Sequence, residues 1–209
     1  MKLQISFDMT DLDKALDIAA TVAPYAHRFE VGTLLLHSAG IVAIERFKKM
    51  FPDKSLLADI KLVDRPKEIV TLLGQTGVDW ITVLAGASRD TIHAASTAAH
   101  GHNIKIMLDL IDAISVGQSA LDAQKLGVHA LCIHRPYDTK ETLTFLEKWD
   151  MIKGNTDLPI YISGNIKEDT FDDIITFKPY GIIVSGTVTK AENPAAYAQK
   201  LFQQCEKNI

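Results

Sequence analysis

A short charged segment between residues 59 and 64 is the part of the sequence best suited to chemistry. It consists of Asp59-Ile60-Lys61-Leu62-Val63-Asp64 and follows an apolar run. Residues two apart on a strand point to the same side, so this spacing predicts that Asp59 and Lys61 share one face. Flanking carboxylates favour the ammonium and raise the pKa of a lysine. The segment therefore favours Lys61 as a fixed cation or acid beside a developing oxyanion, and not as a Schiff-base nucleophile.

A second carboxylate, Glu30, lies at the end of another apolar run, just before Gly32 and Thr33. Hard oxygen ligands such as Glu30 and Asp59 suit Mg²⁺, which commonly takes one or two protein carboxylates plus substrate and water oxygens. The sequence has no thiolate or paired-histidine pattern of the kind that zinc prefers. Glu30 and Asp59 are therefore the candidate ligands of a magnesium ion.

The elements that would position these residues alternate regularly along the chain. Short apolar runs predict strands at residues 3–7, 28–32, 55–60, 79–84, 103–110, 129–133, 158–163 and 181–184. Amphipathic stretches predict helices at residues 11–23, 38–50, 66–75, 90–100, 115–126, 139–149, 167–176 and 194–206. The average repeat of about 26 residues is close to the minimum for a strand and its crossover helix. We expect an α/β protein whose single domain spans residues 1–209.

Eight such units can form an open doubly wound sheet or a closed (β/α)₈ barrel. No GxGxxG or GxxxxGK[ST] pattern follows the first predicted strand, which weakens the open, nucleotide-binding alternative. Polar residues end most of the strands, and in a barrel those ends converge on the mouth where barrel enzymes place their chemistry. The barrel is therefore favoured, with a mouth that includes Asp8, Glu30, Thr33, Asp59, Lys61, Asp64, Asp109, His134 and Arg135.

Two glycine-containing turns follow the last two predicted strands. They are Gly164-Asn165 and Gly186-Thr187. In barrels these loops frequently bind phosphate through backbone N–H groups. We expect all four residues to contact an anionic part of the substrate.

Composition limits the partners and the compartment. The 209-residue chain has a net charge of −4, which predicts no attraction to nucleic acid or to an anionic membrane surface. No apolar run approaches the roughly 20 residues that span a bilayer, and the first residues lack the apolar core of a signal peptide. The two cysteines are far apart and form no CxxC pair, which fits a reducing cytoplasm.

These motifs resemble the orotidine-monophosphate-decarboxylase superfamily, especially its 3-hexulose-6-phosphate synthases and 3-keto-L-gulonate-6-phosphate decarboxylases. The matching segments span nearly the whole chain and are MKLQISFD, FEVGT, FPDKSLLADIKLVD, VDWITVL, MLDLI and IH. The resemblance implies that Asp8, Glu30, Asp59, Lys61 and Asp64 form the active site. Glu30 and Asp59 would bind Mg²⁺, which would hold the oxygens of an enediolate derived from a sugar phosphate.

The resemblance also implies a homodimer with shared active sites, because the equivalent of Asp64 reaches into the neighbouring subunit. His134 matches a histidine associated with proton transfer, and the near-neutral pKa of histidine suits that role. A synthase would generate the enediolate from ribulose 5-phosphate and add it to formaldehyde. A decarboxylase would generate the same anion by losing CO₂.

Several positions bear on the choice between the two activities. Thr187 replaces the arginine that such decarboxylases carry after the last strand, and this favours the synthase, whereas His134-Arg135 is typical of the decarboxylase. We favour the synthase. A pentulose-phosphate epimerase is a third alternative, although only His134 of the metal-binding histidines expected there ends a strand.

A fourth alternative is a barrel without catalytic activity. Arg65-Pro66, Asp112 and Asn165 all depart from the small residues typical of the group. Asn tolerates the left-handed conformation better than most residues, so the loop at residue 165 can keep its shape. Arg65 and Asp112 are the departures expected to change which substrate fits.

Overall fold

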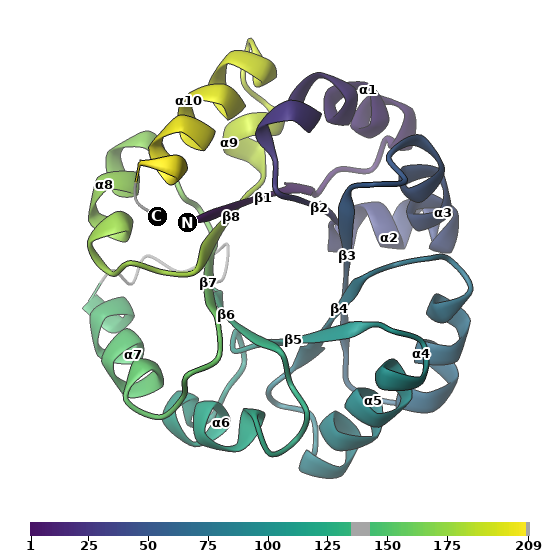
Figure 1. Ribbon diagram of the computed structural model, residues 1–209, viewed down its shortest axis with the longest axis vertical. Helices are drawn as coiled ribbons and strands as arrows, with labels where there is room; N and C mark the ends of the chain where they lie inside the picture. The colour runs from purple at the N-terminus through teal and green to yellow at the C-terminus, as the bar shows by residue number, and fades with distance from the viewer. Residues whose placement is uncertain (135–142, 208–209) are drawn as a thin grey trace.

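The structure, a computed structural model, describes residues 1–134 and 143–207. Its eight parallel strands pair in sequence order, and the last pairs with the first, so the sheet closes into a barrel (Figure 1). This arrangement confirms the (β/α)₈ barrel over the open sheet. The strands are β1 (Lys2–Phe7), β2 (Arg28–Val31), β3 (Ser55–Leu62), β4 (Trp80–Leu84), β5 (Lys105–Asp109), β6 (Ala130–His134), β7 (Ile160–Ser163) and β8 (Gly181–Val184).

Helices surround the barrel on its outer side (Figure 1). They are α1 (Leu12–Val22), η1 (Ala23–Tyr25), α2 (Thr33–Ala39), α3 (Ile41–Met50), α4 (Pro66–Gly74), α5 (Arg89–Gly101), α6 (Val116–Ala123), α7 (Leu143–Lys153), α8 (Glu168–Thr176), α9 (Gly186–Thr189) and α10 (Pro194–Glu206). Within the described ranges, no helix has both the length and the apolar character needed to cross a bilayer.

The first strand shows how the sequence builds two buried faces. Leu3, Ile5 and Phe7 are fully buried in the large outer core between sheet and helices. Gln4 and Ser6 alternate with them and point to the opposite side, which is the inside of the barrel. Both are buried as well. A strand that is buried on both faces thus carries apolar residues outward and polar residues inward.

A small apolar cluster fills the middle of the barrel. Its buried members are Leu57, Met107, Ala130, Cys132, Tyr161 and Ile183, and Trp80 packs against them from one side. The cluster occupies the inward side of β3 to β8, whereas on β1 and β2 the inward positions are polar. The barrel is therefore a packed core with two distinct mouths and not a pore.

The predicted helix over residues 38–50 is wrong in one respect. The chain forms two helices there, α2 and α3, which meet at Gly40 with φ 60° and ψ −152°. This backbone conformation is not helical and is unfavourable for residues with a Cβ, so Gly40 ends α2 and precedes the first residue of α3. The short α9 and η1 were not predicted, and β3 continues to Leu62 beyond its expected end at residue 60.

Other boundaries agree more closely. Residues 139–142 of the predicted sixth crossover helix lie outside the described residues, and α7 extends four residues past the expected end, to Lys153. Gly77 and Gly127, between a helix and the following strand, have positive φ of 77° and 82°. Such left-handed glycines commonly end helices.

Candidate active site

Charged residues of β3, β5 and β6 meet at the carboxyl-terminal mouth of the barrel. The Lys61 ammonium contacts Asp59 Oδ2 and lies 3.5 Å from Asp109 Oδ2. His134 Nδ1 lies 2.9 Å from the same Asp109 oxygen. Asp59 and Asp109 are buried, whereas the Lys61 side chain remains 22% exposed at the mouth. The mouth thus holds one alternating line of charge, from Asp59 through Lys61 and Asp109 to His134.

Lys61 reaches this position through an irregularity in β3. The pairing of β3 with β4 shifts register between Ala58 and Leu62, and Lys61 has φ 46°. The Lys61 N–H donates to Thr82 Oγ1 at 2.9 Å instead of continuing the ladder. The prediction that Asp59 and Lys61 lie together is confirmed, but regular strand alternation is not the reason. Such bulges commonly re-aim a side chain beside an active site.

Asp59 is held by donors on three strands or their loops. Thr33 Oγ1 donates to Asp59 Oδ2 at 2.7 Å, and Thr82 Oγ1 donates to Asp59 Oδ1 at 2.8 Å. The Lys61 ammonium completes the set. Thr33 was predicted to contact substrate, and the structure shows it as a hydrogen-bond partner of Asp59. Thr82 was missed, although a threonine in an otherwise apolar strand is the signal that could have found it.

Glu30 has a separate set of donors on β1. Ser6 Oγ donates to Glu30 Oε1 at 2.6 Å, and Gln4 Nε2 donates to Glu30 Oε2. Gln4 Oε1 in turn accepts from Arg28 Nη1 at 3.1 Å. Because a guanidinium can only donate, this contact fixes the orientation of the Gln4 amide and directs its NH₂ group at Glu30. Sequence analysis missed Gln4 and Ser6, which the polar positions within β1 could have revealed.

The two carboxylates have opposite pKa shifts. Burial and the nearby charge of Asp59 raise the pKa of Glu30 to about 7, although Ser6, Lys61 and Gln4 oppose this. Burial alone would raise the pKa of Asp59 too. The charge and hydrogen bond of Lys61, with the two threonine hydroxyls, outweigh burial and hold it below its ordinary value. Asp59 is therefore the permanent anion of the pair.

Lys61 and His134, the two basic groups of the mouth, both have pKa values shifted toward the protonated form. Burial lowers the pKa of Lys61, but the carboxylates of Asp59 and Asp109 more than offset it and leave the pKa above its ordinary value. This confirms the expected direction. Burial likewise lowers the pKa of His134, and the hydrogen bond and charge of Asp109 reverse that effect and raise it.

The residues present fit a divalent cation. Glu30 and Asp59 repel each other inside the barrel, as the raised pKa of Glu30 shows. Asp59 Oδ2 accepts from both Thr33 and Lys61, whereas Asp59 Oδ1 and the two Glu30 oxygens each accept from one donor and keep a further lone pair. A cation with hard-ligand preference would relieve that repulsion. Glu30 and Asp59 are therefore the residues that would hold Mg²⁺.

Two predicted catalytic acids lie at the rim. Asp8 is exposed, and its Oδ1 accepts from the Leu34 N–H at 2.8 Å, at the start of α2. Gly32 is needed beside it, because a Cβ there would lie 2.8 Å from the Asp8 Cα. Asp64 is exposed between β3 and α4, and the described part of this chain gives it no hydrogen bond or ion pair. The structure does not bring Asp64 to the other charged residues of its own chain.

The expected phosphate-binding turns follow β7 and β8. Gly164 and Asn165 have consecutive positive φ of 98° and 50°, so asparagine does adopt the left-handed conformation expected of it. Gly186 begins α9, and Thr187 Oγ1 donates to the Ile166 carbonyl at 2.6 Å. This hydrogen bond joins the two turns. Their role toward substrate remains a prediction.

The remaining departures have local structural roles. Arg65 has φ 49° and precedes Pro66 at the start of α4. Asp112 Oδ1 accepts from the Gly86 N–H at 3.2 Å and thereby joins the loops after β4 and β5. Arg135, a predicted substrate contact, lies outside the described residues.

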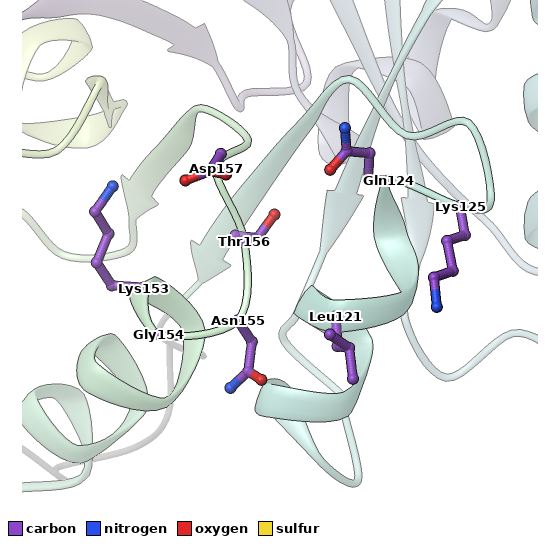
Figure 2. A pocket seen from close by; sticks show the side chains of 8 residues that line it. All are labelled: Leu121, Gln124, Lys125, Lys153, Gly154, Asn155, Thr156 and Asp157. Carbon is purple, nitrogen blue, oxygen red and sulfur yellow. The ribbon is translucent and has the colours of Figure 1, made fainter.

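A cleft also lies away from this mouth. It has a volume of about 620 Å³ and is formed by the ends of α6 and α7 and the loop before β7 (Figure 2). Lys125, Lys153 and Asp157 are the charged residues along it. None of the predicted site residues lines it, and the strand-end residues described above hold the interacting charges.

Comparison with known proteins gives one family. The profile of the Orotidine 5'-phosphate decarboxylase / HUMPS family matches residues 1–201. A 3-hexulose-6-phosphate synthase of Bacillus subtilis (strain 168) is 31% identical over 205 residues, which cover 97% of this chain and 98% of the relative.

Solved structures agree with the sequence relatives. The crystal structure of 3-hexulose-6-phosphate synthase from Salmonella typhimurium has a TM-score of 0.93 at 28% identity, with complete coverage of both chains. A 3-keto-L-gulonate-6-phosphate decarboxylase from Vibrio cholerae has a TM-score of 0.84 at 26% identity, with 97% coverage of both.

Proposed function

Because this chain belongs to the orotidine 5'-phosphate decarboxylase / HUMPS family, we propose that it is a 3-hexulose-6-phosphate synthase. The reaction adds ribulose 5-phosphate to formaldehyde. The observation that carries the proposal is the protonated Lys61 between Asp59 and Asp109, at the mouth where an enediolate would need a fixed positive charge. The 31% identical relative of the same name supports the synthase in particular.

His134 is the residue that we propose moves the proton. Its Nδ1 faces Asp109, so the other ring nitrogen is left to take the C1 proton of ribulose 5-phosphate. The electron pair released at C1 then forms the new bond to the formaldehyde carbon. The proton returns to the former aldehyde oxygen as it becomes a hydroxyl. Asp109 holds the ring throughout and stabilises the imidazolium.

We propose that Glu30 and Asp59 hold Mg²⁺, which when bound supplies Lewis-acid stabilisation of developing negative charge on substrate oxygens. Lys61 supplies the neighbouring fixed charge. Gly164, Asn165, Gly186 and Thr187 are proposed to bind the phosphate through the backbone of the joined turns. Asp8 lies at the rim beside these groups and is proposed to contact substrate hydroxyls.

A homodimer with shared sites is the assembly that we propose. Asp64 is exposed and has no partner within the described part of its own chain, and Val63 beside it is 52% exposed. Leu34, 51% exposed in α2, adds a second large apolar side chain. A partner subunit would cover these side chains and receive Asp64. The cytoplasm remains the proposed compartment, because both cysteines are free and buried.

The first experiment is a substrate screen with Mg²⁺ present. We expect consumption of ribulose 5-phosphate with formaldehyde to be faster than CO₂ release from 3-keto-L-gulonate 6-phosphate. The reverse order would select the decarboxylase, for which the His134-Arg135 segment is the specific support. Epimerisation of ribulose 5-phosphate without formaldehyde would select the epimerase instead.

The second experiment tests Lys61 and distinguishes an enzyme from a silent barrel. Lys61→Met removes the charge and keeps most of the side-chain length. Loss of a preorganised charge of this kind costs on the order of a hundredfold to a thousandfold in kcat. Lys14→Met, on the exposed side of α1, is the matched control and should retain full activity. Equal turnover in both variants would exclude the proposed mechanism.

Mixing two inactive variants tests the shared site. Asp64→Asn and Lys61→Met are each expected to be inactive alone. If Asp64 completes the partner's site, heterodimers contain one intact site of two, so equal mixtures should recover about a quarter of wild-type activity. A dimer that recovers none would show that each chain uses its own Asp64.

A further inference from the structure

The amino-terminal mouth of the barrel contains a partly buried arginine that contacts none of the groups proposed to act on substrate. Arg28, the first residue of β2, lies with its guanidinium 4.1 Å from the centroid of the Trp80 ring and 5.2 Å from that of Tyr161. Its Nη1 donates to Gln4, but its Nε is buried without a hydrogen-bond partner. Within residues 1–134 and 143–207, no carboxylate lies within ion-pair distance of it.

This arrangement is unusual for a cation that is largely withdrawn from solvent. Arginine is seldom buried without an acidic partner, because desolvation of the charge is costly. Two aromatic faces compensate part of that cost. One Nη1 N–H donates to Gln4 and the guanidinium also hydrogen-bonds the Tyr161 side chain, so the Nε–H and the N–H groups beside it are left for an oxyanion.

A cavity lies beside Arg28 at this mouth. Its volume is about 150 Å³, which is enough for roughly five water molecules at about 30 Å³ each, and so for a phosphate-sized ion. Lys2, Ser55, Tyr161 and Tyr180 line it together with Arg28. These side chains provide two cations and three hydroxyl donors, and no acidic residue lines the cavity.

The histidine that lines the cavity is already engaged with an acid outside it. His27 also lines it, but its Nδ1 accepts from the Leu3 N–H at 3.1 Å, and its Nε2 lies 3.4 Å from Glu206. Glu206 is therefore directed at His27, and Arg28 has no carboxylate in contact. The charge of Glu30, which is linked to Arg28 through Gln4, offsets part of the positive charge but does not contact the guanidinium.

We propose that the amino-terminal mouth is a binding site for a small tetrahedral oxyanion, held by the Arg28 guanidinium with Lys2 and the tyrosine hydroxyls at its edge. The site is separate from the proposed phosphate-binding turns. It lies at the opposite end of the strands, where Tyr161 of the apolar cluster forms part of its wall. The cavity is too small for a sugar phosphate, so a free ion is the ligand.

Trp80 provides a local probe of this site, because it contacts Arg28 and the chain has two tryptophans. Trp149→Phe leaves Trp80 as the single emitter. Inorganic phosphate is titrated at constant ionic strength, with sodium chloride as the compensating salt. We expect a saturable change in Trp80 emission that sodium chloride alone does not produce.

Three variants in that background locate the ion. Arg28→Gln should weaken phosphate binding about tenfold or more, because a charge-assisted bidentate contact is lost. Lys2→Gln leaves the Arg28 guanidinium in place and should weaken phosphate binding a few-fold, which is the effect expected for loss of one solvent-exposed ion pair. Lys105→Gln makes the same charge change 5.4 Å from the Trp80 ring but outside the cavity, and should leave binding unchanged.

Two results would overturn the proposal. One is the absence of a saturable change in Trp80 emission. The other is binding that Lys2→Gln and Arg28→Gln leave unaltered, which would place the phosphate at the other mouth. If Arg28→Gln does not fold, the comparison of Lys2→Gln with Lys105→Gln still decides the question.

Discussion

Gln4 offers a sharp test of how the candidate site is supported. It is fully buried and joins Arg28 to Glu30 through one accepted and one donated hydrogen bond. Gln4→Leu keeps a similar volume and removes both contacts. Each hydrogen bond to a charged group contributes about 1.5–3 kcal/mol, so their loss destabilises the fold by about 3–6 kcal/mol. Burial of the leucine offsets part of this, which leaves a net loss of about 2–3 kcal/mol.

The same substitution should weaken metal binding. Glu30 would keep only the Ser6 hydroxyl as a fixed donor from β1. Loss of a hydrogen-bond partner behind a metal ligand typically costs about tenfold to a hundredfold in metal affinity. Isothermal titration with Mn²⁺, as a substitute for Mg²⁺, measures that affinity directly, and urea unfolding measures stability.

Ser96→Ala is the matched control for Gln4→Leu. It removes a buried hydroxyl that donates to the Ile92 carbonyl within α5, outside the barrel. We expect it to lower stability and leave Mn²⁺ affinity unchanged. If Gln4→Leu loses stability but binds Mn²⁺ as tightly as wild type, Gln4 does not position Glu30. If the wild-type protein binds no metal, the metal assignment itself is wrong.

Three further predictions follow from the geometry. The pKa of Glu30 lies at about 7, above the ordinary 4.5, so without metal its contribution to stability is complete below pH 4.5 and is lost as the pH rises through 7. Because metal must displace the Glu30 proton, Mn²⁺ affinity should rise about tenfold per pH unit up to pH 7 and then level off. Titrations with Mn²⁺ at pH 5.5, 6.5 and 7.5 measure this dependence. Asp109→Asn removes the charge that raises the pKa of His134, so the limb of the kcat/KM pH profile due to His134 should move to lower pH, and an unmoved limb would exclude this histidine. Gly32→Ala places a Cβ 2.8 Å from the Asp8 Cα and should lower the free energy of unfolding by about 1–3 kcal/mol. Gly101→Ala is the control, because open space surrounds that position and the substitution should not destabilise α5. Urea unfolding compares the two variants.

The barrel could be predicted from the sequence because its local signals agree with each other. Each strand is an apolar run and each following helix has an apolar face, so period and length separate them. Gly40 shows where this reasoning fails. Residues around it have helical character on both sides, and only the backbone conformation reveals that one helix ends and another begins there.

The candidate site was predictable in its residue types but not in its supports. Asp59, Lys61 and Asp109 are conspicuous because charge is rare inside otherwise apolar strands. The bulge that places Lys61 depends on the register between β3 and β4, which no local pattern encodes. Gln4 and Ser6 were overlooked because a short strand with polar alternate positions resembles one with a solvated face, whereas here both faces are buried.

The electrostatics of the mouth also affect whether formaldehyde, the proposed substrate, would chemically modify the protein. Formaldehyde attacks free amines and thiolates, and the proposed reaction brings it beside a lysine. Lys61 is held as an ammonium by its two carboxylate neighbours, and burial with the nearby acids keeps the Cys132 thiol protonated, its pKa well above the ordinary value. Neither group carries the lone pair or charge that nucleophilic addition requires. The acids that arrange the catalytic charge therefore also make the walls of the site chemically inert toward the aldehyde.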